Sequence, residues 1–469
     1  MKFNHLGLPF VTASNRRQRR RITVSLLVYT CLGIILNIST AHAQACTTAV
    51  TKERNAAYVR NLMTASEGEH IAARGEGLAL ATQRYPTDHG SKYTDDSRKY
   101  TTMPTLNKTN EPWVVTNNTV RINQDDPVLA AIAVSRIAWP ALTEEGRPNG
   151  IVLVTKEHWG IAAAAAHLIH HPLNAPLLYT DQDRIPEATR QEIARLRPKG
   201  IEKGAYPRVI VVGNVHQSVW DQLKAMGFDV RRIASSEPAQ AAADVDLYMS
   251  RTSGQLSPTV VVGSLDAPAF TLPAVNWTAH MPEPLLFVTK DGIPQATADA
   301  LAKRRKTAVI YIIGPRTAVS AETAAQLSAF GRVERIEGAN PTANAVAFAR
   351  YKDPNTGFGW GITTPGHNFS LALGNDPLLI AAAAPFAHKG KHAPLLLTAG
   401  SQIPPVLRQY LEGVRPTYDR TPAEGPYNAA WLLGTASSLT PALQGDIDDL
   451  LEISSGSGAH AAHHGGHGA

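Results

Sequence analysis

The chain has 469 residues, 43% of them hydrophobic, which is enough apolar material for two to four ordinary domains. Its formal net charge is +6, but residues 1–43 hold six basic residues and no acidic ones, so the remainder of the chain is neutral. This balance excludes a polycation that binds nucleic acid through its charge.

The amino end has the order of a signal peptide. Arginines precede a 17-residue apolar run that starts at Ile22, and small residues ending at Ala43 follow it. A membrane anchor is the alternative, but a span needs about 20 apolar residues. We therefore predict a signal peptide at 1–43, no transmembrane span in the mature chain, and export to the envelope, cell surface or periplasm.

Two cysteines are present, and Cys31 lies inside the predicted signal peptide. Cys46 is then alone in the mature chain, which excludes an internal disulfide. It stands where a lipoprotein signal places its acylated cysteine, so it is either a lipid anchor or an incidental thiol. The stretch 44–117 is polar and has no sustained hydrophobic period, so we interpret it as an extension.

A pattern then occurs three times. Each copy opens with arginine and isoleucine, and a proline after a polar residue follows six positions after the arginine, before an alanine-rich stretch. This order predicts the end of a strand and then a helix with proline in its first turn and a polar cap. The arginines are Arg121, Arg232 and Arg335, the caps are Asp126, Glu237 and Asn340, and the prolines are Pro127, Pro238 and Pro341.

A second marker is a proline with two leucines, and an isoleucine–proline pair ends ten positions after that proline. It predicts a buried strand, a polar loop and another helix started by proline. In the third copy, Leu407, Tyr410, Leu411 and Val414 share one helical face. The strand residues are Pro176, Leu177 and Leu178; Pro284, Leu285 and Leu286; and Pro394, Leu395 and Leu396.

A third marker is an apolar strand that ends at Gly213, Gly314 or Gly434. Helices are predicted after these glycines, with Ser320 and Thr440 as caps. Such uniformly apolar strands between helices are typical of parallel sheets covered on both faces. We therefore predict three α/β modules with parallel sheets, at 118–229, 230–332 and 333–453.

Together the three markers resemble the cell wall-binding repeat family of type two, over roughly residues 118–453. The resemblance implies three modules around a pseudo-threefold axis that hold an anionic envelope polymer without a covalent bond. It assigns ligand contact to Arg121, Arg232 and Arg335 and to the three proline–leucine–leucine segments. A structural role, in which each arginine ties a strand end to a helix start, fits these arginines equally.

The chain also departs from the family pattern. The second arginine of the family, six positions after the first, is proline in all three copies, and the usual threonine is Ala130, Ala241 and Asn344. The aspartate that opens the helix after the first strand has a match only at Asp376. The fold is expected to survive these changes, whereas the identity of the ligand is in doubt.

The carboxyl end, 454–469, is a flexible glycine, serine and histidine tail. Its imidazoles suit loose binding of a transition-metal ion, or the tract serves solubility alone. No other cofactor is predicted. The four tail histidines are His460, His463, His464 and His467.

Sequence motifs of enzymes are missing. There is no His-Glu-x-x-His helix or Gly-x-Ser-x-Gly elbow, His170 and His171 are expected at a helix end, and Gly213 does not begin a nucleotide fingerprint. An amidase domain often accompanies such repeats, but 44–117 is too short and polar to form one. We predict a non-catalytic envelope protein; a scaffold that recognises protein and a two-lobed solute-binding protein remain alternatives.

Overall fold

The computed structural model describes residues 113–201, 208–389 and 392–456. The predicted signal peptide, Cys46 and the four tail histidines lie outside these residues. Within the described residues, no helix is long and apolar enough to cross a membrane.

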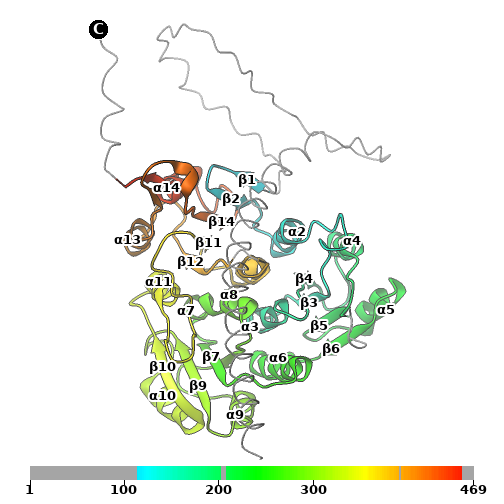
Figure 1. The fold of residues 1–469 in the computed structure, drawn as a ribbon. Helices are drawn as coiled ribbons and strands as arrows, with labels where there is room; N and C mark the ends of the chain where they lie inside the picture. Colours follow the sequence, from blue (N-terminus) through cyan, green and yellow to red (C-terminus); the bar gives the residue numbers. More distant parts are fainter. Residues whose placement is uncertain (1–112, 202–207, 390–391, 457–469) are drawn as a thin grey trace, which may run out of the picture. The chain divides into compact units, whose positions relative to one another are not determined.

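Three parallel sheets organise the described chain (Figure 1). Sheet 1 has the order β4-β3-β5-β6, sheet 2 the order β8-β7-β9-β10, and sheet 3 the order β12-β11-β14-β2-β1. Every pairing in them is parallel except that of β1 with β2. The predicted α/β class with parallel sheets is confirmed.

The strands are short, as expected for buried parallel strands. In sheet 1 they are β3 Ile151–Thr155, β4 Leu177–Thr180, β5 Val209–Val212 and β6 Val230–Ile233. In sheet 2 they are β7 Thr259–Ser264, β8 Leu285–Val288, β9 Ala308–Ile313 and β10 Gly331–Ile336. In sheet 3 they are β1 Trp113–Val115, β2 Thr119–Ile122, β11 Asn368–Ala372, β12 Leu395–Leu397 and β14 Ala429–Leu433, and a separate pair joins β13 Thr417–Tyr418 to β15 Ser454–Ser455.

Helices connect these strands. The α-helices are α2 Pro127–Ala138, α3 Trp159–Ala165, α4 Glu187–Leu196, α5 Gln217–Ala225, α6 Pro238–Ser253, α7 Pro268–Thr271, α8 Pro273–His280, α9 Gln295–Ala302, α10 Ala321–Leu327, α11 Pro341–Arg350, α12 Pro377–Ala383, α13 Pro405–Gly413 and α14 Pro441–Leu451. The 3-10 turns are η1 Ala166–Ile169, η2 Ser328–Phe330, η3 Ala384–Ala387 and η4 Pro422–Glu424.

Each arginine strand belongs to one sheet and its helix to the next. Strands β6 and β10 complete the sheets of the strands that precede them in the chain, whereas α6 contacts β8 and α11 contacts β12. Strand β2 comes before all other parallel strands but pairs with β14 of sheet 3, with Arg121 opposite Leu432. The sheets are therefore offset by one strand from the sequence repeat, and β2 joins the beginning of the described chain to its end.

Most predicted helix starts are confirmed at the level of single hydrogen bonds. Asp126 accepts from the amides of Val128 and Leu129 at 2.8 and 3.0 Å. The side chains of Asn340, Asp376, Ser320 and Thr440 likewise cap α11, α12, α10 and α14. Glu237 occupies the cap position of α6, but its side chain makes no capping bond. The predicted position of the cap and the helix start at Pro238 are therefore confirmed, but the side chain of Glu237 does not cap the helix.

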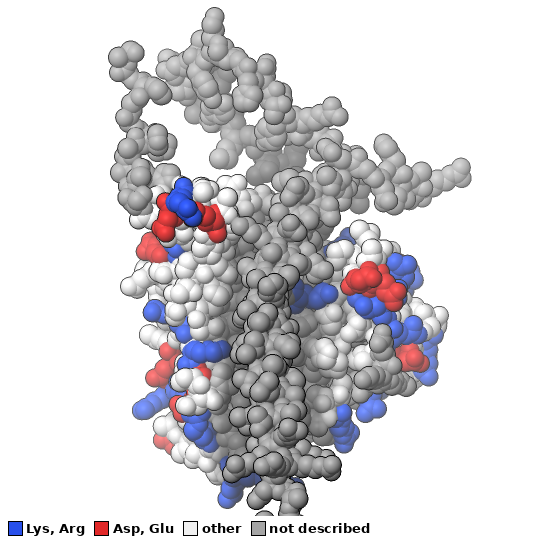
Figure 2. All heavy atoms as spheres, viewed as in Figure 1, with Lys and Arg blue, Asp and Glu red and all other residues white. Residues whose placement is uncertain are grey.

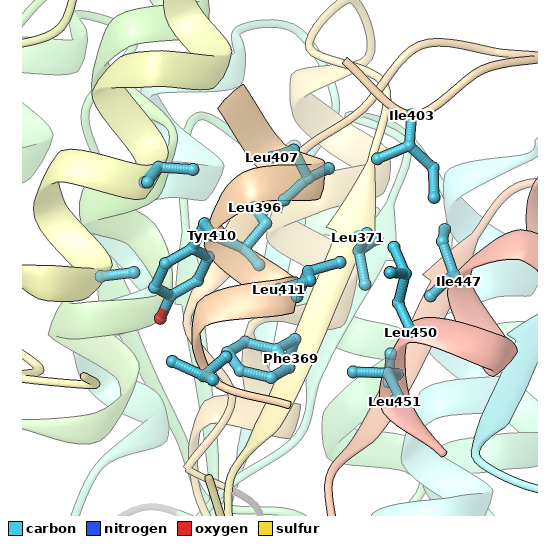
Figure 3. Packing of buried hydrophobic residues seen from close by; sticks show 14 of the residues in the cluster. Phe369, Leu371, Leu396, Ile403, Leu407, Tyr410, Leu411, Ile447, Leu450 and Leu451 are labelled. Carbon is cyan, nitrogen blue, oxygen red and sulfur yellow. The ribbon is translucent and has the colours of Figure 1, made fainter. Parts of the chain in front are cut away.

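The helical face predicted in the third copy is confirmed in the core of sheet 3. Leu407, Tyr410 and Leu411 of α13 point toward Phe369 and Leu371 of β11 (Figure 3). All five side chains are buried, with at most 4% of their surface exposed. Burial of such a side chain stabilises the fold by about 1.5–3 kcal/mol, so this cluster carries much of the stability of the third module.

The glycine that ends β5 is required by both conformation and space. Gly213 has φ of +107°, and a Cβ added there would lie 2.1 Å from Oγ1 of Thr155. We expect Gly213→Ala to lower the free energy of unfolding by about 2 kcal/mol or more, measured by urea denaturation. Gly445→Ala in α14 is the control: a Cβ there meets no atom within 4 Å, so a change of about 1 kcal/mol in the stabilising direction is expected. Equal effects would contradict this account.

Candidate functional site

The proline–leucine–leucine segments lie inside the fold. Each proline carbonyl accepts a hydrogen bond from the neighbouring strand, as Pro176 does from the amide of Val152 at 2.9 Å. The leucines of β4, β8 and β12 have exposures of 0–2%. Their observed role is packing, and ligand contact by these residues stays a prediction.

Arg121 is a buried member of the arginine set, with 2% of its surface exposed. Its guanidinium donates to the carbonyl oxygens of Gly434 and Thr435, both at 3.0 Å, and to Oε1 of Gln444 at 2.9 Å. Burial lowers its pKa, and the nearby charge of Asp125 opposes that shift. Arg121 therefore ties β2 to the loop after β14.

Arg232 and Arg335 make the same kind of contact at more open positions. Arg232 is exposed and donates from Nη2 to the carbonyl of Val215 at 2.8 Å and to Oδ1 of Asn214 at 3.0 Å. Arg335 is half-buried and donates from Nη1 to the carbonyl of Gly314 at 2.8 Å. Each arginine contacts the loop that follows the neighbouring strand β14, β5 or β9. We call these three arginines, together with those loops, the arginine loops.

No carboxylate of the described residues forms an ion pair with the arginine loops, although the charge of Asp125 acts on Arg121 and that of Glu337 on Arg335. Within residues 113–201, 208–389 and 392–456, ion pairs form elsewhere and none reaches Arg121, Arg232 or Arg335. On the face drawn in Figure 2, basic and acidic side chains are interspersed over the described surface. Attraction for an anion is thus local, and it is strongest where a guanidinium is both accessible and unpaired.

A second cluster lies where helical segments of the three sheets meet. Helix α12 contacts α3 and α8, and α8 contacts η1 and η3. These are the alanine-rich segments after the first strand of each sheet, and each ends at a histidine. His170 follows η1, His280 is the last residue of α8, and His388 follows η3. We call these three, with His392, the histidine junction.

The histidine junction consists of ring pairs between modules. The ring centroids of His170 and His388 are 5.5 Å apart, and those of His280 and His392 are 4.6 Å apart at 88°. Nδ1 of His392 lies 3.4 Å from Nε2 of His280. The His280 ring also stacks on Trp360, with centroids 5.1 Å apart and planes at 8°. The segments that follow β3 and β7 are thereby each linked to the segment that follows β11.

Burial and mutual repulsion keep these imidazoles neutral. Burial is the main cause that lowers the pKa of His280 to about 4 and that of His388 to about 3, and neighbouring histidines add to both shifts. Desolvation by the surrounding protein lowers the pKa of His170, and it lowers that of His392 too, although part of the His392 side chain is exposed. At neutral pH the junction therefore presents nitrogen lone pairs without positive charge.

His170 lies at a helix end, as predicted, but no motif in the sequence predicted that these histidines would meet. The only feature of the sequence that could have indicated the junction is an apolar residue followed by histidine at the end of each alanine-rich stretch. His170 and His388 stand six positions before the proline of the leucine marker, whereas His280 stands four before it. Because these offsets differ, the three histidines do not occupy one position of the sequence repeat.

Comparison with known proteins shows a shared fold and partial sequence likeness. No family model matches the chain. The chain is 29% identical over 168 residues to N-acetylmuramoyl-L-alanine amidase LytC of Bacillus subtilis (35% of this chain, 31% of that protein). It is 25% identical over 211 residues to Amidase enhancer of the same organism (44% of this chain, 27% of that protein). The chain thus matches less than a third of the length of either relative.

Two solved structures have the same fold. Cwp6 from Clostridium difficile superposes with a TM-score of 0.57 at 19% identity, covering 71% of this chain and 48% of that chain. Cwp8 from the same organism gives 0.55 at 18% identity, covering 72% and 52%. The modules with parallel sheets described above are therefore an architecture that this chain has in common with Cwp6 and Cwp8.

Proposed function

We propose that the protein is exported and attaches without a covalent bond to an anionic polymer of the cell envelope, without catalysing its cleavage. The observation that carries the proposal is the accessible, unpaired guanidinium of Arg232 and of Arg335, each held at a loop at the end of a parallel sheet. Guanidinium forks suit phosphate and carboxylate groups, which such polymers carry.

The arrangement of modules supports the same proposal. Equivalent helices of the three sheets contact one another, as expected for three cell wall-binding repeats around a pseudo-threefold axis. One matched protein is named an amidase of N-acetylmuramoyl-L-alanine and the other an enhancer of amidase. From these two names we take a place at the cell wall and not an enzymatic activity.

The arginine test uses a pull-down with purified envelope polymers. Changing Arg232 and Arg335 together to alanine should weaken binding at least tenfold, because each charge-assisted hydrogen bond contributes about 1.5–3 kcal/mol. Arg121 is left intact because its buried contacts hold sheet 3 together. Weakening should be greatest at low salt, where the lost attraction is least screened.

The matched control also removes two positive charges, but from arginines outside the arginine loops. Arg190 and Arg420 are solvent-exposed arginines outside the arginine loops, with side-chain exposures of 47% and 88%. The double alanine variant of this pair should bind as the unchanged protein does. An equal loss in both variants would assign binding to net charge, and capture of a protein in place of a polymer would favour the scaffold alternative.

The non-catalytic part has its own measurement. Purified mature protein incubated with peptidoglycan should release neither amino sugars nor peptides above a heat-treated sample. Release that persists through purification would overturn this part and would make the protein an amidase, as one matched protein is named.

A further inference from the structure

We propose that His280 and His392 bind a divalent transition-metal ion of the zinc, copper or nickel class at the histidine junction. The inference is independent of polymer binding, since the arginine loops share no residue with it. It also differs from metal binding by the carboxyl-terminal tail, because both ligands belong to the folded modules.

The separation of the two nitrogens fits one ion. Zinc–nitrogen bonds are about 2.0–2.1 Å long in tetrahedral sites, so two ligand nitrogens stand roughly 3.3–3.4 Å apart. Nε2 of His280 and Nδ1 of His392 are 3.4 Å apart. The two nitrogens belong to separate rings whose planes are nearly perpendicular at 88°, so an ion would lie to one side of the line that joins the nitrogens. A bound ion would take the place of the hydrogen bond between the two rings.

The surroundings hold the His280 ring in place. The His280 ring stacks on Trp360 and makes an edge contact with Trp277, with 6.0 Å between the ring centroids of His280 and Trp277. Trp277 is 2% exposed, so the base of the site is rigid, whereas His392 is exposed and leaves a path for an ion. A ligand oriented in advance loses less conformational entropy on binding.

The charges around the site limit its affinity. Two lysines act against the ion. Lys352 lies close enough to affect His280, and Lys389 to affect His388, and both positive charges oppose a cation. We therefore expect affinity in the micromolar range rather than that of a closed structural site.

The pair leaves coordination positions open. Among the described residues, no group of three histidine, cysteine or carboxylate side chains is arranged to hold an ion. Water or an outside ligand would fill the remaining positions. Because His280 ends α8 and His392 precedes β12, a bound ion would also connect module 2 to module 3.

The experiment removes the tail histidines first, because they would bind the same ions. In full-length mature protein with His460, His463, His464 and His467 changed to alanine, Zn²⁺ is titrated by calorimetry, and Co²⁺ is followed by its visible absorption. We expect one ion per chain, and a rise in the melting temperature with Zn²⁺ concentration.

Variants of the pair decide the outcome. His280→Ala or His392→Ala, each in the background without tail histidines, should weaken binding at least tenfold and abolish the rise in melting temperature. His392→Gln should do the same, since it keeps a polar side chain but removes the imidazole. His216→Ala, an exposed histidine at the start of α5, should change neither. Undiminished binding in the pair variants, or none in their parent, would overturn the proposal.

Discussion

Arg304→Met should lower the free energy of unfolding by about 3–5 kcal/mol, because it leaves a buried carboxylate without its partner. Nη1 and Nη2 of Arg304 each donate to an oxygen of Asp246 at 2.9 Å. The two side chains are only 1% and 5% exposed. Nε of Arg304 donates further to the carbonyl of Ser257 at 2.8 Å. Urea denaturation at pH 7 measures the effect.

Two controls separate burial from the presence of an ion pair. Arg190→Ala removes an exposed ion pair with Glu187, in which the two side chains are 47% and 59% exposed, and should change the free energy of unfolding far less than Arg304→Met does. Removing both charges with Asp246→Leu and Arg304→Met should cost less than Arg304→Met alone. If the variant with both substitutions were less stable than Arg304→Met alone, this explanation would be contradicted.

The same helix contact has different chemistry in each module. Asp246 of α6 stands fourteen positions after the repeated arginine, and its counterparts in α2 and α11 are Ser135 and Ala349. Ser135 donates to the buried carboxylate of Glu192 at 2.6 Å. Ala349 packs in the apolar cluster of sheet 3. The effect of Arg304→Met is therefore specific to module 2.

Acidification from pH 7 to pH 5 should also destabilise the protein. Burial lowers the pKa of His167 to about 3, and the neighbouring charges of His170 and Arg304 act in the same direction. The folded pKa lies below the unfolded value of about 6.5, so below that pH the unfolded chain binds more protons. Each such group costs about 1.4 kcal/mol per pH unit as the pH falls from 6.5 toward its folded pKa.

One buried acid acts in the opposite direction. Burial raises the pKa of Glu283 to about 7, partly offset by hydrogen bonding and by Lys352, so this group gains stability as the pH falls from 7. This gain in stability cancels the loss caused by about one of the neutral histidines. His280 and His388, with pKa of about 4 and about 3, still add to the loss from His167. The net loss should be at least about 1.4 kcal/mol per pH unit between 6.5 and 5.

The measurement is urea denaturation at constant ionic strength, with two variants that shift the slope in opposite directions. His167→Gln should make the dependence on pH shallower, and Glu283→Gln should make it steeper. The window stays above pH 5, so that ordinary carboxylates contribute little. A stability that is flat from pH 7 to pH 5 would contradict the assignment of neutral histidines to the folded state.

The sequence determined the local structure of the modules. Strands ending at Gly213, Gly314 and Gly434, and helices beginning at the prolines after the arginine strands, follow from burial and backbone geometry within a few residues. The exceptions are also local. Glu237 does not cap α6, and β1 forms within the predicted extension, where no hydrophobic period indicated a strand.

Only the tertiary structure decided which elements meet. Strand β2 pairs with β14, and Thr435 donates to Asp125 across 310 positions of sequence. The same closure buries Arg121, whereas Arg232 in an equivalent strand stays exposed. Local patterns specify a strand and the faces it buries, but they do not specify its partner. Pairing, burial of equivalent arginines and the meeting of His280 with His392 depend on contacts between distant residues, which appear only when the modules pack.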